Sequence, residues 1–114
     1  MHRDPRAYLS DILDAIQAIE SATTRFTPDQ YETDRLYRSA VEREFIIIGE
    51  AMNALSAKAP DIFRKITNAR RIISFRNQLT HEYLRINNQV VLGVIQSNLP
   101  LLQSECKGLL ETAD

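Results

Sequence analysis

The chain has 114 residues, of which 44% are hydrophobic and 25% charged, with a formal net charge of −1 and only three glycines. These values are typical of a soluble globular protein and favour helices over a turn-rich β fold. No apolar run approaches the ~20 residues of a membrane-spanning helix, and the first residues lack the apolar core of a signal peptide. The single cysteine, Cys106, fits a reducing compartment. We therefore expect one cytoplasmic domain, 1–114, that does not associate with membranes.

The first half of the chain predicts two helices. Asp4-Pro5 supplies a favourable N-cap and first helical position, and the helix should end near 21–24. Thr27-Pro28-Asp29 is a second start signal, from which a long helix should run to about Ala57, with a start nearer Asp34 as the alternative. Both segments repeat apolar residues at three- and four-residue spacing, as bundle helices do: Leu9, Ile12, Leu13, Ile16 and Ile19, then Val41, Phe45, Ile48, Met52 and Leu55.

The second half predicts a short helical turn and two further helices. Pro60-Asp61 should end the long helix and be followed by a short extra helical turn near 60–65. We expect a third helix from Thr67 to Tyr83 and a last one from about Gln89 towards Leu110, kinked near Pro100. Four main helices with short connections predict an all-α, antiparallel four-helix up-and-down bundle.

Three consecutive isoleucines, Ile46 to Ile48, lie within the long predicted helix. Consecutive side chains point around most of a helix, so the internal core can use one face and the remainder would be exposed in a monomer. We expect a homodimer interface there, and complete burial within the bundle is the alternative.

Basic residues are concentrated between 64 and 85, where six Lys or Arg residues and one Glu give a local net charge of +5. The rest of the chain is therefore acidic. A basic patch on a mildly acidic protein indicates an anionic ligand. A solvated helix face without a ligand explains the charge equally well.

The segment from Phe75 to Tyr83 combines groups that suit phosphate. Arg76 is followed by His81 and, two residues further on, by Tyr83. An arginine can bind phosphate oxygens bidentately, and the ordinary histidine pKa of about 6.5 suits a general acid or base. Each of these residues alone is more often an ordinary surface or core-edge group. The prediction therefore depends on their combination.

On an ideal helix these polar side chains form one broad sector. At about 100° per residue, Thr80 falls close to Arg76, and a group about 100–140° away contains Asn77, Arg70 and His81. We expect Asn77, Arg70 and Thr80 to position a phosphate. Arg76 and His81 would flank a groove rather than touch, and a second copy related by a two-fold axis would place two of each around one phosphodiester.

The pattern Arg-Asn-x3-His-x-Tyr in all-helical surroundings resembles the HEPN domain family, specifically the HepT-type toxins. The resemblance extends over nearly the whole chain, through Tyr8-Leu9-x-Asp11-Ile12, Ala40-Val41-Glu42-Arg43, Ile47-Ile48-Gly49-Glu50-Ala51 and Asn98-Leu99-Pro100-Leu101-Leu102. It implies a metal-independent endoribonuclease toxin that needs no cofactor. Arg76 and His81 would be its catalytic residues, at a composite site between two copies that cleaves RNA by attack of the 2′-hydroxyl.

The resemblance also implies a partner for Tyr83. A separate minimal nucleotidyltransferase antitoxin would transfer AMP to this tyrosine, and the added negative charge would silence the site by repulsion and occlusion. The chain contains neither the Gly-Ser motif nor the Asp-x-Asp pair of such a transferase, so the enzyme must be another polypeptide.

Small residues around Glu50 predict a close approach between two helices. Gly49 and Ala51 would leave Glu50 partly buried, where it would need a partner such as Arg76 of the third helix. Simple exposure of Glu50 is an equal alternative.

Other functions fit the sequence less well. The main alternative is a non-catalytic nucleotide-binding or accessory subunit that partners a nucleotidyltransferase and presents Tyr83 to it. The local charge of +5 disfavours a purely structural bundle. Only His2 and His81 are available for a metal, no Glu-x-x-His pair is present, and no compact helix-turn-helix pattern indicates a repressor.

Overall fold

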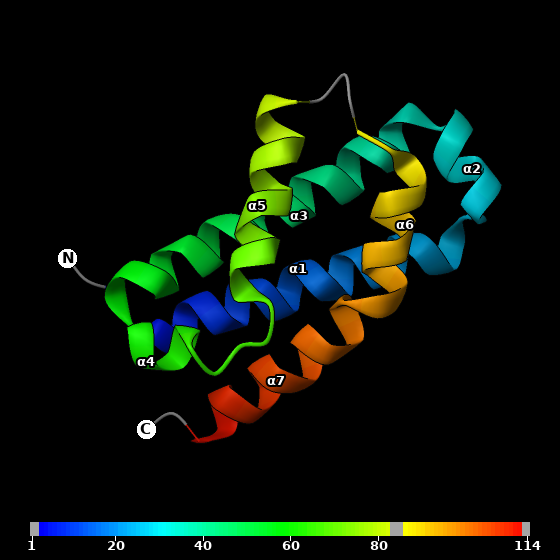
Figure 1. The fold of residues 1–114 in the computed structure, drawn as a ribbon. Helices are drawn as coiled ribbons and strands as arrows, with labels where there is room; N and C mark the ends of the chain where they lie inside the picture. The colour runs from blue at the N-terminus through cyan, green and yellow to red at the C-terminus, as the bar shows by residue number, and fades with distance from the viewer. Residues whose placement is uncertain (1–2, 83–85, 113–114) are drawn as a thin grey trace.

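The computed structural model describes residues 3–82 and 86–112, and every regular element in these ranges is a helix. The two long helices, α1 (Pro5–Arg25) and α3 (Arg35–Lys58), lie side by side and run antiparallel (Figure 1). Helix α7 (Leu99–Thr112) packs along α1, and α5 (Ala69–His81) crosses α3 (Figure 1). The shorter helices are α2 (Pro28–Thr33), α4 (Pro60–Phe63) and α6 (Asn88–Ser97).

These elements confirm the predicted all-α bundle. The expected helical turn near 60–65 is α4, and the expected break near Pro100 separates α6 from α7 at Asn98. Among the described residues, no helix is both long and apolar enough to cross a bilayer.

Side-chain caps set the helix starts in the first half of the chain. The Asp4 carboxylate accepts a hydrogen bond from a backbone N–H in the first turn of α1, at 2.9 Å. Thr27 and Gln30 form a reciprocal capping box at α2. Asp34 ends α2 and caps α3 by accepting from the Tyr37 backbone N–H at 3.1 Å. The long helix therefore begins at the alternative start near Asp34, because this one residue serves both helix ends.

Helix α5 begins later than the predicted start at Thr67. The Thr67 backbone N–H and hydroxyl donate to the Glu105 carboxylate of α7 at 3.0 and 2.7 Å. Asn68 then takes a left-handed conformation with φ 58°, which asparagine adopts more readily than most residues. A contact with a distant helix thus holds Thr67 outside α5, which begins two residues later at Ala69, and the local pattern contains no sign of it.

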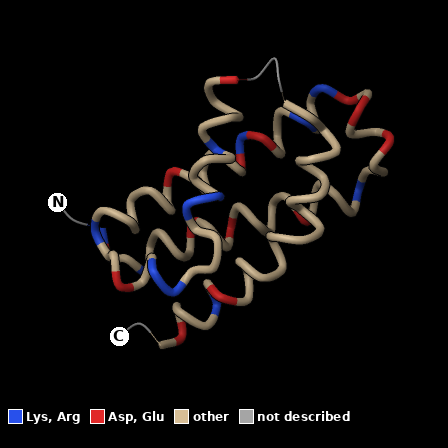
Figure 2. Tube along the Cα trace, in the orientation of Figure 1, with Lys and Arg blue, Asp and Glu red and all other residues tan. Residues whose placement is uncertain are grey.

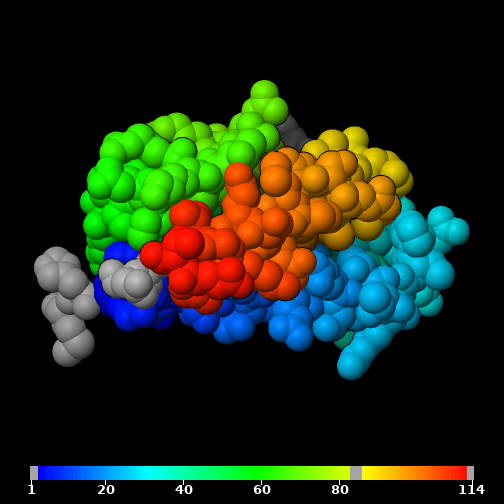
Figure 3. Space-filling view, turned by 90° about the horizontal axis from the view of Figure 1, so that it is seen from below, coloured from blue at the N-terminus to red at the C-terminus, as the bar shows by residue number. Residues whose placement is uncertain are grey.

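The predicted apolar seams of α1 and α3 meet in one core. Helix α7 packs along α1, and the two helices lie side by side on the face drawn in Figure 3. The fully buried residues of the two seams have 0% exposure: Leu9, Ile12, Ile16 and Ile19 in α1, and Ile48, Met52 and Leu55 in α3. In α7, burial raises the pKa of the Cys106 thiol to about 12. This cysteine therefore packs as a protonated, unreactive group.

The isoleucine run divides between the core and the surface. Ile48 is fully buried, whereas Ile46 and Ile47 are half-buried at the edge of the core. The bundle therefore does not bury the run completely, and Ile46 and Ile47 keep part of their apolar surface exposed.

Candidate functional site

Helix α5 carries most of the predicted site residues, and only one of its sides is anchored. Ala69 and Leu79 are its buried residues. The Phe75 ring meets Phe45 of α3 edge to face, with the ring centroids 5.1 Å apart. Because α5 packs mainly on α3, the side chains of Asn77, Thr80 and His81 on its other sides are exposed.

Arg76 lies at the contact between α5 and α3. The stem of its side chain rests on Gly49, and the side chain is 27% exposed. Nη1 donates to the Asn77 Oδ1 atom at 2.9 Å, and Nη2 lies 3.5 Å from the Glu50 Oε1 atom. Nε is buried and has no hydrogen-bond partner within the described ranges. The guanidinium is therefore held in one orientation, with its Nη end as the part that can meet a phosphate.

Glu50 lies beside Arg76, as the small residues around it suggested, yet its side chain is 53% exposed. Both readings of Glu50 therefore hold in part. An exposed ion pair of this length contributes at most about 1 kcal/mol to stability. The main effect of Glu50 is to place a negative charge beside the guanidinium.

Asn77 and Thr80 both bond to Arg76, and this limits what each can offer a phosphate. The Thr80 hydroxyl donates to the Arg76 backbone carbonyl at 2.9 Å, so its single proton is already used. Asn77 accepts from Arg76 through Oδ1 and keeps its NH2 group as a donor. In this arrangement Asn77 is better suited than Thr80 to hold a phosphate oxygen.

Arg70 is not brought to the same place. Its guanidinium carbon lies 5.3 Å from the centre of the Phe63 ring of α4. Six residues along a helix correspond to about 9 Å, which separates the backbone positions of Arg70 and Arg76. Arg70 therefore belongs to the α4 end of the surface rather than to the immediate surroundings of Arg76.

His81 is the exposed last residue of α5, and within the described ranges its imidazole forms no hydrogen bond. The stem of Arg76 lies against α3, whereas His81 is at the exposed end of the same helix. The predicted AMP acceptor, Tyr83, lies outside the described residues.

Lys and Arg positions follow one another from the end of α4 into the first half of α5 (Figure 2). Arg64, Lys65, Arg70 and Arg71 are exposed, and of these Arg64 forms an ion pair with Asp61. The local positive charge that the sequence showed is therefore on the surface, with Arg70 and Arg71 on the same helix as Arg76 and His81 and with Arg64 and Lys65 between α4 and α5.

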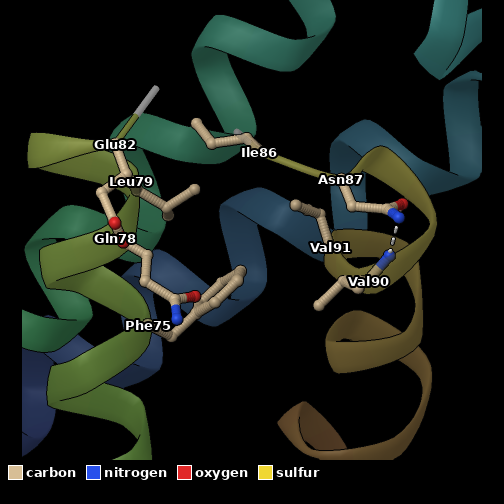
Figure 4. A pocket seen from close by; sticks show the side chains of 8 residues that line it. All are labelled: Phe75, Gln78, Leu79, Glu82, Ile86, Asn87, Val90 and Val91. Atoms are coloured by element: carbon tan, nitrogen blue, oxygen red, sulfur yellow. Dashed lines mark hydrogen bonds between the residues drawn. The ribbon is translucent and has the colours of Figure 1, made fainter. Parts of the chain in front are cut away.

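Two adjoining cavities, of about 360 and about 200 Å³, lie on the flank of α5 that faces α6 and α7. They share Phe75 and Gln78. In the smaller one, these residues point across a gap towards Ile86 and Val90 (Figure 4). The sequence did not predict these cavities, because their walls come from helices that are far apart in the chain. Phe75, an aromatic residue beside polar neighbours, was the one available signal.

The described residues contain no group of three or more His, Cys, Asp or Glu side chains that could hold a metal ion. The groups that this site offers to a ligand are a fixed guanidinium, an amide, an exposed imidazole and a basic surface. This set is suited to binding a phosphate and transferring protons beside it.

The fold and the motif on α5 are those of a helical nuclease domain, and the chain belongs to the family described as ribonuclease HepT-like, which it matches over residues 12–109. It is 29% identical over 112 residues to a protein of Thermococcus cleftensis named "Probable ribonuclease HepT", covering 96% of the chain and 98% of that protein. It is 26% identical over 109 residues to a protein of Caldanaerobacter subterraneus subsp. tengcongensis named "Putative RNase", covering 96% of both.

A longer relative is also similar. The chain is 28% identical over 114 residues to a protein of Methanocaldococcus jannaschii named "Gamma-glutamylcyclotransferase and putative RNase". All of the chain is covered, but it spans about half (51%) of that relative's length. No solved structure gives a significant match to the chain. At these modest identities, the family and the names of the relatives support a ribonuclease activity.

Proposed function

We propose that this chain is a metal-independent endoribonuclease toxin that cleaves RNA at a composite site formed by two copies. The observation that carries the proposal is the fixed guanidinium of Arg76 on the same helix as the exposed imidazole of His81. The ribonuclease HepT-like family and the relatives named as ribonucleases support it.

The reaction is a transesterification within RNA. The ribose 2′-oxygen attacks the adjacent phosphorus, and His81 of one copy takes the 2′-hydroxyl proton. The bond from phosphorus to the 5′-oxygen breaks, and His81 of the second copy, in its protonated form, gives a proton to that oxygen. Arg76 stabilises the charge that develops on the non-bridging oxygens. The products are a 2′,3′-cyclic phosphate and a 5′-hydroxyl, and no water is consumed.

The angle between Arg76 and His81 on α5 supports a site made from two copies. Arg76 and His81 are about 140° apart around an ideal helix, and in the structure Arg76 faces α3 while His81 is exposed. A two-fold related copy supplies the second half of the site. The half-buried Ile46 and Ile47 offer apolar surface for such an association.

Control of the toxin would involve Tyr83 and a separate nucleotidyltransferase antitoxin. The phenol oxygen would attack the α-phosphorus of ATP, releasing pyrophosphate and leaving AMP on the tyrosine. The added phosphate would lie two residues from His81 and would compete with RNA for the basic surface. In Tyr83→Phe we expect largely intact cleavage and no incorporation of AMP, measured by intact mass after incubation with the transferase and ATP. Continued incorporation would assign the acceptor to another residue.

The test of the ribonuclease proposal is RNA cleavage by the purified chain in excess EDTA, after a mass spectrum has shown that the chain is unmodified. His81→Ala should remove cleavage. Lys107→Ala, an exposed cation on α7, is the matched control and should retain it. A 2′,3′-cyclic phosphate at the new 3′ end should be detected by mass spectrometry of the products.

Other outcomes would favour different functions. Cleavage that survives in His81→Ala would remove the assigned role of the imidazole. No cleavage of several RNAs by the unmodified wild type would favour a non-catalytic subunit that presents Tyr83 to a transferase. The occupied guanidinium of Arg76 already lends some weight to that second function, because Asn77 and Glu50 take two of its hydrogen-bonding directions.

A further inference from the structure

Three glycines occur in helices, and one of them differs sharply from the others. A Cβ atom built on Gly49 would lie 2.2 Å from the Arg76 Cβ atom and 2.4 Å from its Cγ atom, whereas real Cβ atoms essentially never approach within 3.0 Å. The same atom built on Gly93 or Gly108 would meet nothing within 4 Å. The contact at Gly49 involves the root of the arginine side chain, which cannot swing away as a flexible end could.

This contact determines which part of the guanidinium faces outwards. With the stem of Arg76 against the α3 backbone, Nε is buried and lacks a partner among the described residues. Nη1 and Nη2 are directed towards Asn77 and Glu50. The long side chain is thus held at both ends before a ligand arrives, which lowers the entropy that binding would otherwise cost.

We infer that Gly49 is a positioning residue for Arg76, and that its missing side chain fixes which edge of the guanidinium meets the substrate phosphate. The phosphate meets the Nη1–Nη2 end, because the Nε–Nη2 edge is closed by the buried Nε. An oxygen of the phosphate then replaces the Glu50 carboxylate on Nη2. The catalytic part of this inference rests on the proposed ribonuclease function, whereas the steric part does not.

The steric part is tested by three glycine-to-alanine variants measured side by side. Gly93→Ala and Gly108→Ala add a better helix former in open space, and their thermal midpoints should rise by about 2–5 °C. Gly49→Ala should lower the midpoint instead, because the new methyl group pushes α5 away from α3. A rise of the same size in all three variants would overturn the inference.

The positioning part is tested by a double-mutant cycle on RNA cleavage. Gly49→Ala should lower kcat/KM about 10-fold or more, as a misplaced catalytic group does. In an Arg76→Lys background, which keeps the Cβ and Cγ atoms, the same substitution should lower kcat/KM no further. Equal losses in both backgrounds would mean that Gly49 acts on the whole protein rather than through the guanidinium.

A spectroscopic measurement separates this inference from the proposed function. The Arg76 Nε–H signal, assigned by its loss in Arg76→Lys, should exchange slowly with water in the wild type and rapidly in Gly49→Ala. This result is expected even if the wild type cuts no RNA, which would refute the ribonuclease proposal alone. Fast exchange in the wild type would refute the positioning role alone.

A variant that does not fold still gives an answer. If Gly49→Ala is unfolded, adding Arg76→Gly removes the atoms that clash and should restore the helical circular dichroism spectrum. If the double variant also stays unfolded, the contact between these two positions is not what Gly49 provides, and the inference fails.

Discussion

Helix α1 buries six of its 21 residues, Tyr8, Leu9, Ile12, Ala15, Ile16 and Ile19, whereas α5 buries two of its 13, Ala69 and Leu79. The first helix contacts both α3 and α7, and the second packs mainly on α3. The side chains of α1 therefore contribute mainly to the stability of the core, whereas α5 keeps polar side chains exposed to a ligand. The proposed chemistry is therefore on the less buried of the two helices, whose position depends on its contacts with α3.

The largest expected effect is a loss of stability that should differ between α1 and α5. Ile16→Ala in α1 should lower the free energy of unfolding by about 2–5 kcal/mol, because it leaves a cavity in the core. Ile73→Ala in α5 is the matched variant, and since Ile73 is half-buried its loss should be about 1 kcal/mol. Urea unfolding measures both values. Equal losses would show that α5 is anchored as firmly as α1.

The second effect concerns activity and should be confined to α5. Arg76→Lys should lower kcat/KM for RNA about 10- to 100-fold, because an ammonium cannot replace a fork with two Nη donors. Stability should change by less than about 1 kcal/mol, since the exposed ion pair with Glu50 is weak. Cleavage assays and urea unfolding of the same preparation provide the comparison. Near-normal cleavage would remove Arg76 from the proposed mechanism.

The smallest expected effect on stability concerns a buried tyrosine hydroxyl in α2. Tyr31 is 0% exposed and its hydroxyl has no hydrogen-bond partner in the described part of the chain. Tyr31→Phe should therefore leave the free energy of unfolding at pH 7 unchanged or raise it by up to about 1 kcal/mol. Tyr8→Phe is the matched variant. It should cost about 0.5–1 kcal/mol, because the Tyr8 hydroxyl accepts from Lys58 Nζ at 2.9 Å.

The same tyrosine predicts a dependence on pH. Burial raises the pKa of the Tyr31 phenol above its usual value. The unfolded chain therefore loses this proton first, at about pH 10, and stability falls as the pH rises above that value. Tyr31→Phe should lose less stability than the wild type between pH 9 and pH 11, by urea unfolding at each pH. Parallel pH curves for the two proteins would contradict this assignment.

The sequence alone predicted the parts of the fold that depend on local rules. The cap at Asp4, the apolar seams of α1 and α3, and the break near Pro100 all follow from residue type and spacing. The start of α5 was predicted too early, because the bond between Thr67 and Glu105 joins segments far apart in the chain.

The candidate site was predictable to a similar degree. The small residues around Glu50 gave a contact with an arginine such as Arg76 as one of two equal alternatives, and that contact is present. The separate place of Arg70 above Phe63 and the bond of Thr80 to the backbone were not predictable. Angles around an ideal helix give the direction of a side chain, but they do not say which neighbour it will meet.

The contact between Gly49 and Arg76 also has a consequence for how related sequences can diverge. Any larger residue at position 49 meets the first carbons of the side chain at position 76, so position 49 cannot change while α5 stays in place. A lineage that replaces Gly49 must therefore bring a glycine to position 76 or move α5 away from α3, because every other residue at position 76 keeps the clashing Cβ atom. Retention of glycine at position 49, whichever residue stands at position 76, would be the record of that constraint.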